Sequence, residues 1–146
     1  AQNYTVASNA LRYEYWKNVR GFSYDYTEAT IEAEWRSMLR FRLQYSPDYS
    51  IFVRGRPMRE FQTLTGEVQF SRALHRSVLG TVALGYYDLS DAIGSGFFFW
   101  SVGAVATRGR LSAALSYVQV DDHARNLFSA PYTRNKLIAS LAWRLR

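Results

Sequence analysis

The chain has 146 residues, of which 48% are hydrophobic and 16% aromatic, a length that accommodates one domain, 1–146, and is too short for a second. No stretch approaches the ~18 consecutive apolar residues of a membrane-spanning helix, and the lack of cysteine excludes disulfides and thiolate metal sites. The net charge of +6 comes from dispersed Lys and Arg rather than from a basic run, which argues against nucleic acid as a partner.

Alternation of apolar and polar residues predicts strands along the chain, because successive side chains of a strand point to opposite faces. The first predicted strand, 4–16, alternates weakly. Its apolar face holds Leu11, Tyr13 and Tyr15, and its other face holds Arg12 and Glu14.

The next two predicted strands alternate clearly and are joined by a short turn near Ser37. Strand 27–36 carries Ala29, Ile31, Ala33 and Trp35 on one face, and strand 39–46 carries Leu39, Phe41, Leu43 and Tyr45. Pairing them as a hairpin sets glutamates against arginines on the polar face. Mutual neutralisation explains these carboxylates better than a divalent-metal site does. The predicted interior charge network comprises Glu28, Glu32, Glu34, Arg40, Arg42, Glu67 and Arg144.

Further predicted strands follow at 64–71, 78–87, 98–106, 111–117 and 137–146. Short turns near Ser37, at 74–77 and at 108–110 alternate with long connections, which we place at 17–26, 47–59, 88–96 and 121–135. His75 falls in the second short turn, as a solvated residue without a role. Short turns on one rim and long loops on the other are typical of outer-membrane barrels.

The predicted fold is therefore all-β: an eight-stranded antiparallel up-and-down transmembrane β-barrel with an apolar outside and a charged interior. Aromatic residues near strand ends would form a girdle at the headgroup level, namely Trp35, Tyr45, Tyr86, Trp100, Tyr117 and Trp143. The alternative is a soluble sheet that packs them in a core. We expect the outer membrane of a Gram-negative bacterium, after removal of a signal peptide.

Several short strings resemble a family of proteobacterial exported proteins with the provisional label Gcw-chp. They are YDYTE at 24–28, YSPDY at 45–49, WSVG at 100–103 and LSYV at 115–118. The resemblance implies an outer-membrane barrel and no activity. The chain departs from the family in two ways: members usually have additional N-terminal strands and a terminal aromatic residue, whereas this sequence ends in Leu145 and Arg146.

A search for catalytic chemistry finds one candidate, in the last long connection. His123 lies beside Asp121 and Asp122 and near Ser129, which are the elements of a base-activated nucleophile. Loop Asp and Ser are also common turn residues, and we predict no catalytic residue, metal or cofactor.

Arg54, Arg56 and Arg59 cluster in the second long connection, where they could contact lipopolysaccharide phosphates. The competing interpretation of these three arginines is a solvated basic loop.

The leading functional hypothesis is a non-enzymatic outer-membrane protein of structural or interaction type. Its expected partners are outer-membrane lipid and other envelope proteins that contact the long loops, as in a larger envelope assembly. Three alternatives stay open: a narrow pore for small solutes, a soluble lipocalin-like ligand-binding barrel, and a lipid-modifying barrel enzyme.

Overall fold

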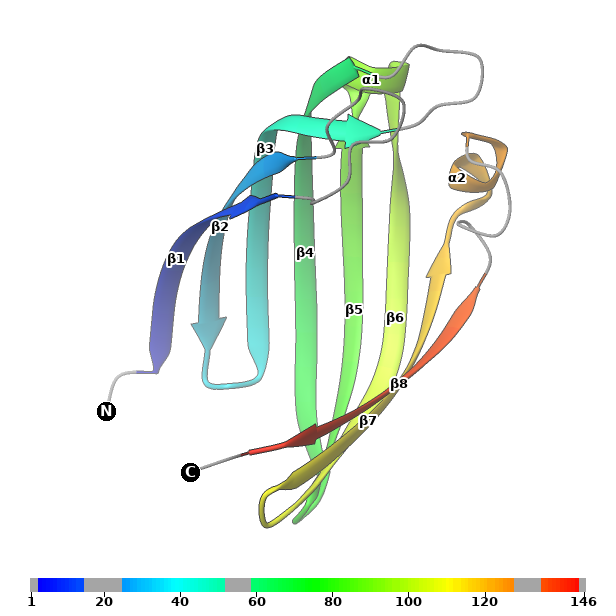
Figure 1. Cartoon of the computed structure of the whole chain (residues 1–146). Helices are drawn as coiled ribbons and strands as arrows, with labels where there is room; N and C mark the ends of the chain where they lie inside the picture. Colours follow the sequence, from blue (N-terminus) through cyan, green and yellow to red (C-terminus); the bar gives the residue numbers. More distant parts are fainter. Residues whose placement is uncertain (1–2, 15–24, 52–58, 128–134, 145–146) are drawn as a thin grey trace.

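The computed structural model describes residues 3–14, 25–51, 59–127 and 135–144. The chain is all-β, with eight antiparallel strands that follow one another up and down in a single sheet of order β1 to β8 (Figure 1), as predicted. The strands are β1 (Tyr4–Tyr13), β2 (Tyr26–Trp35), β3 (Leu39–Ile51), β4 (Arg59–His75), β5 (Val78–Leu89), β6 (Ser95–Arg108), β7 (Leu111–Val120) and β8 (Lys136–Trp143). Two short helices are α1 (Ser90–Ile93) and α2 (Asp122–Leu127). No helix within these residues is long and apolar enough to cross a membrane.

Several strands are longer than the alternation predicted, and this corrects the predicted connections. The pairing of β5 with β6 continues through Asp88 with Gly96 and Leu89 with Ser95, so the connection predicted at 88–96 shrinks to α1 and Gly94. His75 ends β4 opposite Val78 and is not a turn residue. Backbone ladders extend beyond the amphipathic stretch because they do not depend on side-chain alternation.

The three short turns, 36–38, 76–77 and 109–110, lie at one end of the sheet, which we call the turn rim; the opposite end is the loop rim. β1 begins and β8 ends at the turn rim (Figure 1). In the first turn the Met38 N–H donates to the Trp35 carbonyl at 3.0 Å, and the ladder begins with Trp35 opposite Leu39. Arg36 and Ser37 have φ of 51° and 52°, the left-handed values that the strand twist favours in such hairpins.

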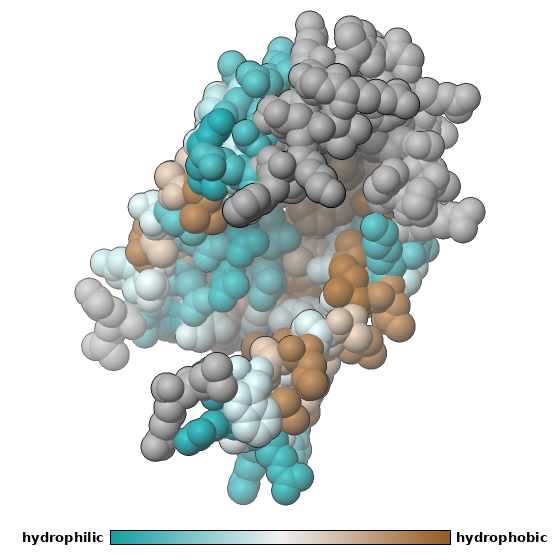
Figure 2. All heavy atoms as spheres, viewed as in Figure 1, coloured by the Kyte–Doolittle hydropathy of each residue, from teal (hydrophilic) through white to brown (hydrophobic). Residues whose placement is uncertain are grey.

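The sheet is strongly curved (Figure 1), and its two faces differ in exposure and in chemistry. The inward face contains the buried Thr30, Ser46, Thr63 and Ser71. The outward face contains exposed apolar residues, namely Ile31, Phe41, Leu43, Leu64, Val68, Phe70, Val82, Leu84, Phe98, Val102, Leu115, Leu137 and Leu141. Hydrophilic residues accordingly gather in the hollow of the sheet (Figure 2).

The sheet is not closed: among the described residues, β1 pairs only with β2, and β8 pairs only with β7. Almost every residue of these two edge strands is exposed on both faces. The pairing also corrects the faces predicted for the first strand. Leu11 lies opposite Glu28 on the inward face, whereas Arg12 lies opposite Thr27 on the outward face. The alternation of β1 is too weak to identify its faces, so only its register with β2 decides them.

Candidate functional site

Ion pairs cross from β2 to β3 on the inward face. Arg42 Nε lies 2.6 Å from Glu32 Oε1, and Arg40 Nη2 lies 3.1 Å from Glu34 Oε2. Glu32 is the direct register partner of Arg42, and Glu34 that of Arg40, so the tight hairpin turn sets both pairs. Gln44 Nε2 donates to Glu28 Oε2 at 2.7 Å and provides the third carboxylate with a partner.

Among the described residues, the other two members of the predicted charge network form no ion pair. Glu67 is half-buried on β4, opposite Arg42, whose hydrogen bond goes to Glu32 on the other side. Arg144 follows β8, is exposed, and donates its backbone N–H to the Arg110 carbonyl at the turn rim. Arg144 therefore lies at the turn rim, away from the inward ion pairs of β2 and β3.

Tyrosine rings from four strands converge at the loop-rim end of the inward face. The rings of Tyr13 and Tyr26 stack with centroids 4.5 Å apart, Tyr49 meets Tyr26 at 5.0 Å, and Tyr87 meets Tyr49 at 6.5 Å. Beside them lies a small core of Phe61, Leu89 and Ala92 with Phe97, Ile93 and Tyr87 packed against it. The sequence did not predict this cluster, because each of the four strands contributes a single ring. The four half-buried rings therefore form a continuous row across this end of the inward face.

The predicted girdle residues lie at two levels of the outward face. Trp35 and Trp143 end β2 and β8 at the turn rim. Tyr45, Tyr86, Trp100 and Tyr117 lie nearer the loop rim; the rings of Trp100 and Tyr117 pack at 5.7 Å, and Tyr86 packs on Phe98 at 4.8 Å. Between the levels the outward side chains are mostly aliphatic.

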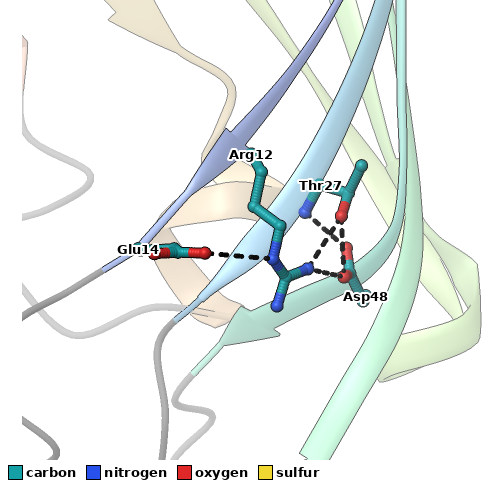
Figure 3. A network of polar contacts seen from close by, with 4 residues as sticks. All are labelled: Arg12, Glu14, Thr27 and Asp48. Carbon is teal, nitrogen blue, oxygen red and sulfur yellow. Dashed lines mark hydrogen bonds and ion pairs between the residues drawn. The ribbon is translucent and has the colours of Figure 1, made fainter.

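A polar cluster lies near the loop-rim ends of β1, β2 and β3 (Figure 3). Asp48 accepts hydrogen bonds from the Thr27 backbone N–H at 2.6 Å, from its hydroxyl at 3.1 Å and from Arg12 Nη1 at 3.0 Å. Glu14 lies 4.0 Å from Arg12 Nε. Asp48 reaches Thr27 because the register of β3 with β4 shifts between Ser46 and Tyr49. This polar cluster lies where the apolar stretch of these strands ends. The register of β1 with β2 brings Arg12 to Thr27 and Asp48, and the sequence pattern did not predict this contact.

The candidate catalytic residues of the last connection have structural partners. His123 Nε2 lies 3.0 Å from Ser95 Oγ at the start of β6. Asp121 accepts the backbone N–H of Ala124 and of Phe98, each at 2.9 Å, so it caps α2 and ties it to β6. Burial raises the pKa of Asp121, but these hydrogen bonds outweigh it and hold the pKa below the ordinary 3.8.

Both oxygens of the Asp121 carboxylate therefore accept backbone N–H groups, and the carboxylate does not orient the His123 ring. Ser129, Arg54 and Arg56 lie outside the described residues, and for Arg59 only the backbone, at the start of β4, is described. Within the described part of the chain, no group of acidic, histidine and cysteine side chains has the arrangement of a metal site.

Models of protein families, curated proteins and solved structures were compared with the chain, and none of them matches it significantly. The resemblance to the Gcw-chp family therefore stays a prediction.

Proposed function

We propose that the chain is an integral outer-membrane β-barrel protein of non-enzymatic, structural or interaction type. The observation that carries this proposal is the inverted distribution of side chains. Leu43, Val82 and Leu84 are 49%, 53% and 57% exposed on the outward face, while the polar Thr30 and Thr63 are 6% and 5% exposed on the inward face. Water would disfavour such an outward face, and lipid hydrocarbon would match it.

The height of the apolar stretch supports a membrane crossing. On β6 the outward residues run from Phe98 to Arg108, ten residues later. Ten residues span ~34 Å along a strand and, at a tilt of about 40°, ~26 Å along the membrane normal, close to the ~25 Å apolar band of transmembrane barrels. Trp35 and Trp143 then fall near one interface, and Phe98, at the other end of this stretch, falls near the other interface.

Closure of the sheet is part of the proposal. β1 runs from the turn rim to the loop rim and β8 runs back, so the two edges are antiparallel. Hydrocarbon does not tolerate unpaired backbone N–H and C=O groups, because each costs several kcal/mol there. Pairing of β1 with β8 satisfies both edges, completes eight strands and covers inward residues such as Leu11 and Ile138, which are 47% and 48% exposed.

The alternatives have less support. A lipocalin-like barrel needs its apolar residues on the sheltered face, where this chain has Thr30, Ser46 and Thr63. A pore needs an open hollow where the tyrosine cluster lies. The interaction role is assigned to the loop rim, from which the long connections leave the sheet.

Cell fractionation with electrophoresis tests the membrane assignment. The protein should sediment with the outer membrane, need detergent for extraction, and migrate differently before and after boiling, as folded barrels do. Quantitative release into aqueous buffer without detergent would contradict the proposal.

Engineered cysteines test closure, because the natural sequence contains none. Val6→Cys on β1 is combined with Cys at Ala139, Leu141 or Trp143 on β8. One of these pairs should form an intramolecular disulfide in vesicle-inserted protein, whereas Val6→Cys with Val82→Cys on β5 should not. Disulfide-linked dimers in place of the intramolecular product would mean that the edges pair with a second copy.

A further inference from the structure

The described arginine side chains divide into two groups. Arg12, Arg40 and Arg42 each form an ion pair with a carboxylate. The turn-rim arginines are exposed, and among the described residues none of them pairs with a carboxylate; they are Arg36, Arg72, Arg76, Arg108, Arg110 and Arg144. Arg36 instead lies 4.8 Å from the ring centre of Trp35. This rim therefore has positive charge that the described part of the protein does not neutralise.

The outward face of β6, β7 and β8 arranges side chains in rows above two of these arginines. The row at the turn rim is Arg108, Leu111 and Trp143, and Arg110 lies in the turn that joins β6 to β7. The next rows are Ala106, Ala113 and Leu141, then Ala104, Leu115 and Ala139, then Val102, Tyr117 and Leu137. The arginines and the Trp143 indole thus lie at the turn rim, and the alanine-rich rows follow toward the loop rim.

These rows enclose a shallow hollow of about 560 Å³ that is open to the outside. Its lining includes Ala104, Ala106, Ala113, Ala139, Leu115 and Leu141. The four alanines leave a depression because larger side chains surround them. Toward the loop rim, Tyr117 follows in the next row and packs on Trp100.

We propose that this hollow binds an acyl chain of an anionic glycerophospholipid whose phosphate contacts Arg108 and Arg110. The proposal rests on the proposed membrane location. Guanidinium groups bind phosphate oxygens bidentately, and basic residues at an interface favour anionic lipid. The turn rim of an outer-membrane barrel faces the leaflet on the periplasmic side. The unneutralised charge at the head of the hollow selects an anionic headgroup over a zwitterionic one.

Fluorescence quenching by brominated lipids tests this site. A single-tryptophan protein that retains Trp143, which is 63% exposed, is inserted into vesicles of phosphatidylcholine mixed with phosphatidylglycerol. Either lipid is brominated in turn, and the two quenching curves give the relative association constant at Trp143. We expect a preference for phosphatidylglycerol of about fivefold for each arginine in contact. A protein that retains only Trp100 serves as the reporter away from the rim and should show no preference.

Charge variants locate the effect. R108Q/R110Q should bring the ratio at Trp143 close to one, and R108K/R110K should keep most of the preference. R36Q/R76Q removes the same charge from the other two turns of the same rim and should leave the ratio unchanged. An equal loss in R36Q/R76Q would mean a diffuse electrostatic attraction and would overturn the site.

The failures of the two proposals are distinguishable. If neither brominated lipid quenches Trp143, the protein is not in the bilayer and the proposed function fails. If both lipids quench it equally in the protein with all its arginines, the membrane location stands and the lipid site is rejected.

Discussion

An arginine placed on the outward face should cost stability in proportion to its depth in the membrane. Leu84 is 57% exposed on β5, between Val68 on β4 and Trp100 on β6. It lies six residues from Val78, the first residue of β5 at the turn rim. Six residues correspond to ~20 Å along the strand and ~15 Å along the normal at a tilt of about 40°, near the middle of a ~25 Å band.

L84R should therefore lower the free energy of unfolding by about 2–4 kcal/mol in vesicles. If water covered this face instead, the same change at an exposed position would alter the stability by ~0.5 kcal/mol or less. L74R is the matched control, because Leu74 is 67% exposed but lies at the turn-rim end of β4. It should cost about 0–1 kcal/mol, as charges near the interface do.

The assay is reversible denaturant unfolding of vesicle-inserted protein, followed by tryptophan fluorescence, with ΔG extrapolated to water. The depth dependence decides the result. An L84R protein as stable as the unmodified chain, or an L74R protein destabilised as much as L84R, would refute the lipid-facing interpretation.

Three further predictions concern stability. The side chains of Glu32 and Arg42 are 31% and 39% exposed, so their coupling energy in a double-mutant cycle should be about 1–2 kcal/mol, a value between those of surface and buried ion pairs. E60Q, at an exposed carboxylate, should leave the free energy of unfolding nearly unchanged in the same denaturant titration. D121A should lower the free energy of unfolding by about 1 kcal/mol at pH 7. Because the pKa of folded Asp121 lies below 3.8, the full difference between the two proteins should be present above pH 3.8 and should vanish on further acidification. Melting curves that differ equally at all pH values would contradict this prediction. S37G should stabilise by about 1 kcal/mol by removing a left-handed non-glycine residue, whereas an unchanged unfolding midpoint would show that the turn is unstrained.

The local elements of this fold could be predicted from alternation and turn length. The hairpin around Ser37 has a short turn of three residues, 36–38, so its register pairs Trp35 with Leu39 and places Glu32 opposite Arg42 and Glu34 opposite Arg40. Strand ends were predicted less well, as the short connection between Leu89 and Ser95 shows, because ladders persist where side chains no longer alternate. The role of Asp121 as a helix cap was also missed, because loop Asp and Ser are common turn residues and no helix was predicted at 121–135.

The sequence by itself determined that the chain has two chemically different faces and which residues of β2 to β8 share each face, because a period of two is a local property of a strand. Only the tertiary structure decided which face is sheltered, since curvature results from all eight strands pairing together. It likewise decided that Tyr13, Tyr26, Tyr49 and Tyr87 converge from separate strands, and that Arg12 turns outward. Contacts of this kind depend on register between strands distant in sequence, which no pattern within one strand contains.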